Sequence, residues 1–261
     1  MYSKSINKAE DDLVDYTLFL ADSSLIMGHR LSEWTGHGPM IEQDIAITNI
    51  ALDLIGQARN FYQYAAGMIT EIQGKKVTED DLAYLRDANE FKNLLITELP
   101  NGDWAKTILK VFFLSVWQFY FYQKLIYSED KRLSAIAEKS LKEVTYHVKW
   151  SSDWVIRLGD GTEESQGKIA NAIEDLWPYT GEMFMPVEFE NNLKNSVGIV
   201  VSSIKNDYIE KVAAVLKEAT LYVPRESWMH TGGKKGVHTE HLGYILAEMQ
   251  FLQRAYPGLE W

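Results

Sequence analysis

Apolar residues recur at helical spacing along almost the whole chain. A first stripe occupies residues 13–34, and a segment with two glycines and one proline follows at residues 35–39. Recurrence at i, i+3, i+4 and i+7 is typical of amphipathic helices, and glycine and proline end them. The pattern therefore predicts an all-α chain, with residues 197–204 giving the one weak strand signal.

The later stripes predict a series of further helices. The helix at 40–67 is apolar on nearly all sides, which predicts a central position. Thr78 with Asp81 fits a capping box, Asp103 fits an N-cap, and Pro178 is expected to kink its helix. No repeat or linker interrupts the pattern, so we expect one domain over residues 1–261. Further helices are expected at 82–98, 104–128, 132–158, 165–183, 206–221 and 238–256, with loops or irregular segments at 70–81, 186–207 and 224–236.

Composition narrows the possible functions of this helical chain. Its 261 residues are 46% hydrophobic, contain no cysteine and carry a net charge of −11. The lack of cysteine excludes disulfides, thiolate metal sites and cysteine nucleophiles. The negative charge argues against nucleic-acid binding. The longest apolar run, 111–122, is interrupted and shorter than the roughly 20 residues that a membrane span needs. The first residues lack the apolar core of a signal peptide, so we expect a cytoplasmic protein.

Aromatic residues are numerous, with eight tryptophans and fourteen tyrosines. Such side chains are typical of large buried areas and of protein interfaces. The expected helix at 104–128 is especially rich in them. A cofactor pocket is one interpretation, but a buried core or interface helix explains this pattern more simply.

Glu143 and His147 are the first candidate metal ligands. They are four residues apart, so both side chains lie on one helix face. Di-metal carboxylate bundles use Glu-x-x-His on each of two helices, plus one Glu from each of the other two. Here Tyr146 stands three residues after Glu143, and Val144 stands three before His147. The motif is broken in either register.

Asp44 is a second candidate because it shares a helix face with Ile47, Ala51 and Leu54. A buried carboxylate needs a charged or hydrogen-bonding partner. The sequence favours a salt bridge or a cap at Asp44 over a role as metal ligand.

A glycine-rich basic segment at residues 231–236 precedes the last expected helix. Backbone N–H groups at a helix N-terminus attract anions, so a phosphate could bind here. The segment does not satisfy the Walker pattern, and a loop or partner contact is the alternative. The candidate residues are Gly232, Gly233, Lys234 and Lys235.

His238 and His241 follow one turn apart, with Glu240 between them. Their spacing matches neither zinc-protease motif, HExxH or HxxEH. Polar contacts at the start of a helix are the expected role.

Five stretches carry a resemblance to a known family. The chain resembles the PaaC family of subunits of the bacterial phenylacetyl-CoA oxygenase, the ring epoxidase of aerobic phenylacetate degradation. The matching stretches are LSEWTGHGPMIEQDIAITNIALDLIGQARNFYQYAA (31–66), ELPNGDWAKTI (98–108), KEVTYHVKWSSDWVIRLGDGT (142–162), ATLYVP (219–224) and TGGKKGVHTEHLGYILAEMQFLQRAYPG (231–258).

The resemblance implies a ferritin-like helical bundle with additional C-terminal helices. It implies a structural, non-catalytic subunit that pairs with a catalytic sibling, PaaA, and stabilises it. In this family PaaA carries the di-iron centre and binds phenylacetyl-CoA, and PaaB and the reductase PaaE complete the electron path. No cofactor is then expected in this chain.

On this interpretation Asp44, Glu143 and His147 are the remnant of a metal cluster, with Glu33 a weaker member. We expect these side chains to bond one another or nearby Lys and Arg. The segment containing Gly232, Gly233, Lys234 and Lys235, followed by His238 and His241, would face the catalytic sibling or its CoA ligand.

Two alternatives stay open at this stage. An active di-iron or di-manganese carboxylate oxidase would use Asp44, Glu143, His147, His238 and His241 as ligands. A helical scaffold unrelated to oxygenases is the other. The sequence also leaves open whether the chain associates with itself.

Overall fold

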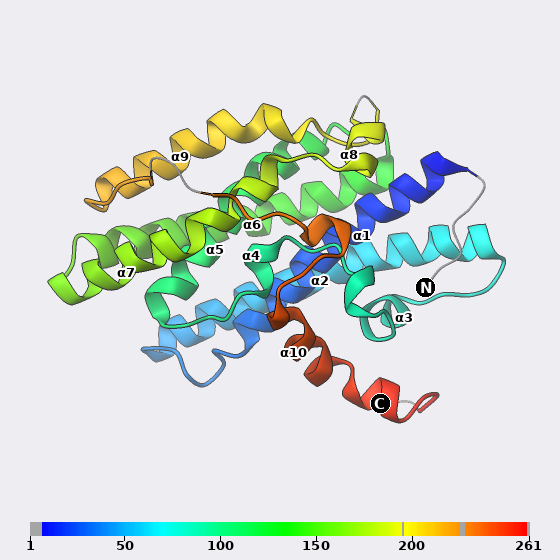
Figure 1. The fold of residues 1–261 in the computed structure, drawn as a ribbon, viewed down its shortest axis with the longest axis horizontal. Coiled ribbons are helices and arrows are strands. Elements are labelled where there is room, and N and C mark those ends of the chain that lie inside the picture. The colour runs from blue at the N-terminus through cyan, green and yellow to red at the C-terminus, as the bar shows by residue number, and fades with distance from the viewer. Residues whose placement is uncertain (1–6, 195, 225–227, 260–261) are drawn as a thin grey trace. The chain divides into compact units, whose positions relative to one another are not determined.

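The computed structural model describes residues 7–194, 196–224 and 228–259 (Figure 1). These residues form helices and connecting segments, with no strand among them, so the all-α, ferritin-like class is confirmed. No helix in the described part is long and apolar enough to cross a membrane. Residue contacts divide the chain into two compact units, and the single domain stays a prediction. Unit 1 comprises Met1–Pro100, Val187–Leu193 and Gly232–Trp261, and unit 2 comprises Asn101–Pro186 and Lys194–Thr231.

Two long helices, α1 (Lys8–Ser32) and α2 (Ile41–Gln73), pack along each other in unit 1 (Figure 1). The Asn7 side chain caps α1 by accepting a hydrogen bond from the backbone N–H of Ala9 at 3.2 Å, as N-cap residues do. Helix α2 continues beyond the predicted end and is capped by Gly74, whose φ of 66° suits a glycine C-cap. The first stripe and the second helix are confirmed.

The expected central position of α2 is wrong for its first half. Ile41, Leu52 and Ile45 are 72%, 61% and 56% exposed, while Ile47 and Leu54 are buried. The helix therefore buries one apolar face and leaves another uncovered. Apolar residues on all sides indicate burial only when every side has a partner.

The expected helix at 82–98 is wrong, because this segment breaks into three short pieces. An extended stretch between them turns backbone N–H groups toward α1. The N–H of Lys92 donates to Asp22 at 2.8 Å, and the N–H of Leu94 donates to Ser23 at 3.2 Å. These bonds replace helical ones. The pieces are α3 (Glu79–Tyr84), which starts with the predicted capping box, η1 (Ala88–Glu90) and α4 (Leu95–Glu98).

The remaining elements of unit 1 come from later in the chain. Part of the segment expected to be irregular is helical, as α8 (Glu188–Leu193). The last expected helix begins two residues late and is divided at Gln250, whose side-chain amide donates to the carbonyls of Ala83 and Arg86. Its parts are α10 (Glu240–Met249) and α11 (Phe251–Ala255), preceded by η5 (Gly233–Lys235).

Unit 2 is built around α5 (Trp104–Leu125), which packs along α6 (Lys131–Gly159) and also contacts α7 (Glu163–Leu176) and α9 (Lys205–Glu218). The predicted N-cap Asp103 accepts from the N–H of Lys106 at 2.9 Å. The aromatic residues of α5 that are fully buried or nearly so confirm its role as a core helix. They are Phe112, Phe113, Trp117, Phe121 and Tyr122.

Pro178 ends α7 rather than kinking it. Two short 3-10 turns, η2 (Trp177–Tyr179) and η3 (Gly181–Phe184), follow the helix. Proline lacks the N–H that would continue the α-helical ladder, so the chain changes direction here. A third turn, η4 (Val201–Ile204), lies where the weak strand signal stood.

Candidate functional site

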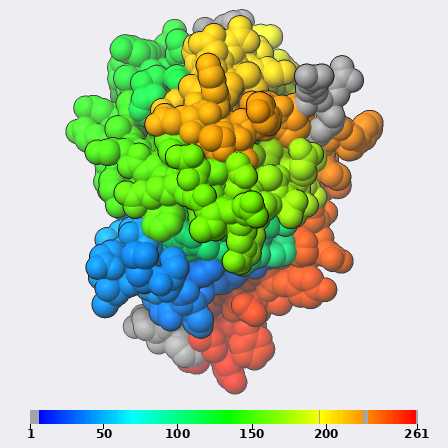
Figure 2. All heavy atoms as spheres, turned by 90° about the vertical axis from the view of Figure 1, so that its left-hand side faces the viewer, coloured from blue at the N-terminus to red at the C-terminus, as the bar shows by residue number. Residues whose placement is uncertain are grey.

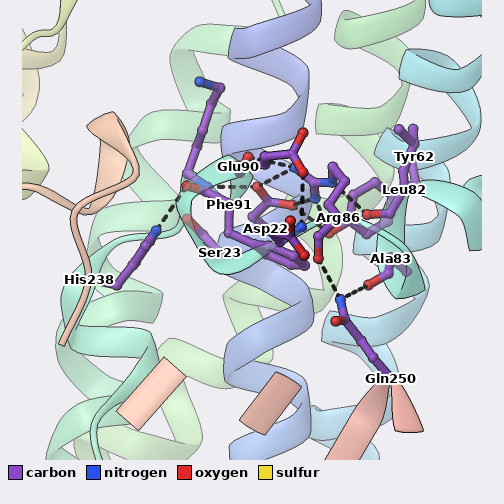
Figure 3. A network of polar contacts seen from close by, with 12 residues as sticks. Asp22, Ser23, Tyr62, Leu82, Ala83, Arg86, Glu90, Phe91, His238 and Gln250 are labelled. Carbon is purple, nitrogen blue, oxygen red and sulfur yellow. Dashed lines mark hydrogen bonds and ion pairs between the residues drawn. The ribbon is translucent and has the colours of Figure 1, made fainter. Parts of the chain in front are cut away.

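A buried polar network surrounds Asp22 of α1 (Figure 3). Its carboxylate accepts hydrogen bonds from the Tyr62 hydroxyl at 2.5 Å, the backbone N–H of Lys92 at 2.8 Å and the guanidinium of Arg86. Asp22 is fully buried and Arg86 is 5% exposed. Arg86 also donates to two backbone carbonyls of its own segment. A buried ion pair with its remaining positions hydrogen-bonded avoids most of the cost of burying charge.

These contacts shift two pKa values. Burial, followed by the charge of Asp22, raises the pKa of the Tyr62 hydroxyl well above its usual value. Burial opposes the charge of Arg86, but the charge and hydrogen bond of Asp22, together with Tyr62 and Glu90, outweigh burial and raise the pKa of the guanidinium. At neutral pH Tyr62 is therefore a neutral donor and Arg86 a cation. Both serve as fixed hydrogen-bond donors.

A second buried carboxylate, Glu98 of α4, pairs with His238 just before α10. The Nδ1 atom of His238 lies 2.9 Å from Glu98 Oε2, and the Nε2 atom lies 2.9 Å from the Phe91 carbonyl oxygen. An ionised carboxylate and a carbonyl oxygen only accept hydrogen bonds, so both ring nitrogens carry hydrogen. Burial disfavours the charged ring, but the hydrogen bond and charge of Glu98, helped by Phe91, outweigh it and raise the pKa of His238.

Glu98 also binds three other segments of unit 1. Its Oε1 atom accepts from the backbone N–H of Thr239 at 2.6 Å, and its Oε2 atom accepts from the Asn93 amide at 2.9 Å. The Arg30 guanidinium of α1 donates to the Glu98 backbone carbonyl at 2.9 and 3.0 Å. The start of α10 is thus held to α1 and α4 by one fully buried glutamate.

The glycine-rich segment packs directly against the backbone between α3 and α4. A Cβ atom on Gly233 would lie 2.2 Å from the Asn93 carbonyl oxygen, and one on Gly236 would lie 2.2 Å from that of Asn89. Neither distance is possible for a real Cβ. Gly236 also has a φ of 76°, which favours glycine. These glycines therefore serve close packing of the segment.

Lys234 points into unit 1 rather than toward solvent. Its Nζ atom lies 3.0 Å from both carboxylate oxygens of Glu190 in α8, and both side chains are 1% exposed. The ammonium group also lies 5.0 Å from the ring centroid of Phe19. Because Lys234 is buried and paired with Glu190, it is not placed to bind an external anion such as a CoA phosphate. The neighbouring Lys235 is exposed.

The other predicted contact residues have local roles at the same place. Gly232 has a φ of 141°, a conformation open chiefly to glycine. His241 is half-buried, and its backbone N–H donates to the N-cap Thr239 at 3.3 Å. The His238 side chain makes the expected polar contacts at the start of the helix, whereas the contact described for His241 is made by its backbone.

The unit 1 members of the suspected remnant cluster lie at the turn between α1 and α2. Glu33 pairs with Arg30 at 2.7 Å, as expected of a partner for Arg. The Asp44 carboxylate accepts from the backbone N–H of Gly38 at 2.9 Å. That bond, followed by backbone bonds from Gly36 and His37, lowers the pKa of Asp44. Asp44 thus has the structural role favoured by the sequence, but it binds the backbone of the turn before α2 and does not cap the helix, whose N-cap is Met40. Its contacts with described residues include no ion pair to Lys or Arg.

Glu143 and His147 belong to α6 of unit 2. His147 is fully buried and Glu143 is half-buried. The Ser151 hydroxyl donates to the His147 backbone carbonyl at 2.7 Å. Within the described ranges, no three or more His, Asp or Glu side chains are grouped so that they could hold a metal ion.

The most heavily used polar residues of unit 1 did not emerge from the sequence. Asp22 carried a signal, because it stands at four-residue spacing between the buried Leu18 and Ile26. Glu98 and Glu190 carried none, since their partners are 140 and 44 residues away. One sequence gives no indication of which distant side chains meet.

Comparison with known proteins agrees with the helical fold and extends along the chain. The family model described as phenylacetic acid catabolic protein matches residues 2–261. The chain is 46% identical over 253 residues to the C subunit of the 1,2-phenylacetyl-CoA epoxidase of Escherichia coli (strain K12). That match covers 96% of this chain and 100% of the relative. The chain therefore belongs to the phenylacetic acid catabolic protein family.

Proposed function

We propose that this chain is a non-catalytic structural subunit of a phenylacetyl-CoA epoxidase complex. It pairs with the catalytic sibling PaaA and stabilises it, and PaaA holds the di-iron centre. PaaB and the reductase PaaE are further members of the complex. The proposal follows from full-length similarity to a relative that is named as the C subunit of that enzyme.

The observation that carries a structural role is the pairing of buried charges in unit 1. Asp22 binds Arg86, Glu98 binds His238, and Glu190 binds Lys234. In a di-metal bundle the carboxylates and histidines converge, and their oxygen and nitrogen atoms are directed at the ions. Here each carboxylate is neutralised by a cation of the protein. These groups are thus used to connect segments.

The alternative of an active di-metal oxidase is less compatible with this geometry. It requires His238 as a ligand, yet both ring nitrogens are bonded, one to Glu98 and one to Phe91. Ligation would break at least one of those buried bonds. It also requires Asp44, whose carboxylate already accepts hydrogen bonds from backbone N–H groups of the turn before α2.

For the glycine-rich segment we favour a protein contact over a CoA phosphate. Its exposed lysine, Lys235, lines a groove of about 420 Å³ together with Lys8 and Lys234. The carboxylates of the same groove are Asp11, Asp12, Asp15 and Glu188. Three lysines against four carboxylates give the lining a formal charge of −1, and Lys8 and Lys234 are already paired with Glu188 and Glu190, so little positive charge is left for a phosphate.

Elemental analysis of the chain purified alone tests the absence of a metal centre. We expect iron and manganese far below one ion per chain and no oxidation of phenylacetyl-CoA. Two iron or manganese ions per chain, with oxidation of an acyl-CoA, would establish the alternative.

Co-expression with PaaA tests the structural role. We expect a complex with one chain of each and a higher melting temperature for PaaA than PaaA alone. If PaaA stays separate from this chain and equally stable without it, the proposal fails.

A further inference from the structure

The C-terminal helical segment, residues 240–259, has one face fixed to unit 1. Leu242, Ile245 and Leu246 are buried there. The Gln250 amide donates to the carbonyls of Ala83 in α3 and of Arg86 just after it, as seen in Figure 3. The Arg254 guanidinium donates to Asp87 and to carbonyls of the turn after α3. The segment is therefore an ordered part of the surface.

The opposite face of the segment is apolar and uncovered. Tyr244, Phe251 and Leu252 are 66%, 61% and 46% exposed. In the space-filling view of Figure 2 the C-terminal residues, coloured red, are visible at the surface. Large apolar side chains grouped on one exposed helix face indicate a binding surface.

A groove runs beside these residues. It has a volume of about 500 Å³, and its lining includes Gly243, Ala247, Phe251 and Ala255. Those four recur every fourth residue, with Gly243 and Ala247 on α10 and Phe251 and Ala255 on α11, so in each helix the two lie on one face. Three are small and one is large, which makes a row that the side chains of a packed helix can enter. The shape fits a helix.

The charged residues that line the groove, Asp87 and Arg254, balance each other, but the exposed charges of the segment outside this lining do not. The positive charge of Arg254 is paired with Asp87 at 3.0 Å. Glu240 and Glu248 are exposed on the segment, and no described residue forms an ion pair with either. The unsatisfied charge is thus acidic, and a complementary surface carries Lys or Arg.

From this groove, its apolar rim and its acidic flank, we infer that the C-terminal segment docks an amphipathic helix of PaaA that has an apolar face bordered by basic residues. The inference rests on the proposed function and adds the surface through which the two subunits meet. A second copy of this chain is a poorer occupant. It would bring Glu240 and Glu248 against like charges, between chains that each carry a net charge of −11.

The test compares two exposed aromatic residues. Phe251 on the segment is 61% exposed and Tyr127 after α5 is 82% exposed, so F251E and Y127E replace an exposed aromatic ring by the same charge, and Tyr127 lies off the uncovered apolar face of α2. Binding of purified PaaA to each full-length variant is measured by calorimetry. We expect F251E to weaken binding by at least about tenfold, as burial of a charge at an interface does, and Y127E to stay within about twofold of wild type. Circular dichroism checks that both variants keep their helices.

Each result separates the two proposals. Equal affinities for the two variants, whether both are weakened or both unchanged, would overturn the docking inference while leaving the structural role. Failure of the wild-type chain to bind PaaA would overturn the proposed function itself. A homodimer of this chain, seen by sedimentation and dissociated by F251E, would show that the occupant is a second copy and would also overturn the inference.

The acidic flank gives an independent test. E248K should reduce the association rate with PaaA several-fold at low salt, and the difference from wild type should shrink as salt is added. An unchanged or faster association would contradict the basic border inferred for the partner helix.

Discussion

The two units of this chain are stabilised by different kinds of contact. Among its described residues, unit 1 has buried ion pairs centred on Asp22, Glu98 and Glu190. In unit 2 the pair of Lys168 with Glu164 lies at the surface, and the buried ammonium group of Lys110 donates to the Asn101 side-chain oxygen at 2.9 Å. Most of the described contacts inside unit 2 are aromatic, with edge-on and tilted contacts along α5, α6 and the turn after α7.

This difference matches the way each unit is assembled from the sequence. The main contact of unit 2 is between α5 and α6, which follow one another through a short connection. Unit 1 joins three separate stretches of the chain. Apolar contacts tolerate many partners, whereas a hydrogen-bonded ion pair requires one geometry. The comparison indicates that buried charges in unit 1 select which distant segments meet.

The largest expected effect comes from removing one partner of a buried pair. R86A leaves Asp22 charged and buried, and it also removes the guanidinium from the face of the Phe91 ring, 4.3 Å away. We expect a loss of about 5 kcal/mol in the free energy of unfolding, measured with urea. The double variant D22N/R86A should recover part of this loss, because no charge is left unpaired. A loss below about 1 kcal/mol for R86A would break the comparison.

The next effect belongs to unit 2. F113A removes a fully buried ring that packs edge-on against Trp177, and we expect a loss of about 3–4 kcal/mol. Because the contact is apolar, the loss should be the same at pH 6 and pH 9. A loss that changes between these pH values would show that the aromatic core is coupled to titrating groups.

His238 sharpens the comparison through pH. Glu98 raises the pKa of His238 in the folded state above its unfolded value of about 6.5, despite the opposing effect of burial. The stabilisation is therefore complete below pH 6.5 and is lost as the pH rises through the folded pKa. In urea unfolding, the wild type should lose more stability than H238Q between pH 6 and pH 9.

His29 is the control with the opposite sign. Burial lowers the pKa of His29 in the folded state, against the smaller opposing charge of Glu33. Its contribution should therefore increase as the pH rises toward 6.5. If H29Q and H238Q changed the pH dependence in the same direction, the assignment of charge to His238 would be wrong.

The smallest effect is expected at the surface of unit 2. Lys168 and Glu164 form an exposed pair one turn apart on α7. Their hydrogen bond lowers the pKa of Glu164 and raises the pKa of Lys168, but solvent screens the interaction. K168A should leave the unfolding midpoint unchanged within error.

The sequence predicts local structure well and long-range pairing poorly. The stripes of α1, α5 and α6 and the caps at Thr78 and Asp103 are confirmed, because each depends on residues a few positions apart. The segment at 82–98 was predicted wrongly because side chains of α1 capture its backbone N–H groups. Apolar periodicity contains no information about such a contact.

At the candidate site, too, the sequence indicates local features but not long-range partners. For Gly233 and Lys234 the sequence offers a phosphate site or a loop and partner contact, and for His238 it predicts polar contacts at the start of a helix. The structure places Lys234 against Glu190 and His238 against Glu98. A basic segment in a sequence attracts either a ligand or a distant carboxylate of the same chain, and only the fold distinguishes them.

The discontinuity of unit 1 has a consequence for synthesis on the ribosome. Helices α1 and α2 emerge early, whereas Lys234, His238 and Gln250 are translated more than 130 residues after Pro100. At 5–20 residues per second this interval lasts roughly 7 to 30 seconds. Throughout it Asp22 can meet Arg86, but Glu98 has no imidazolium. The nascent N-terminal part must therefore wait, incompletely folded, for the last segment to leave the exit tunnel.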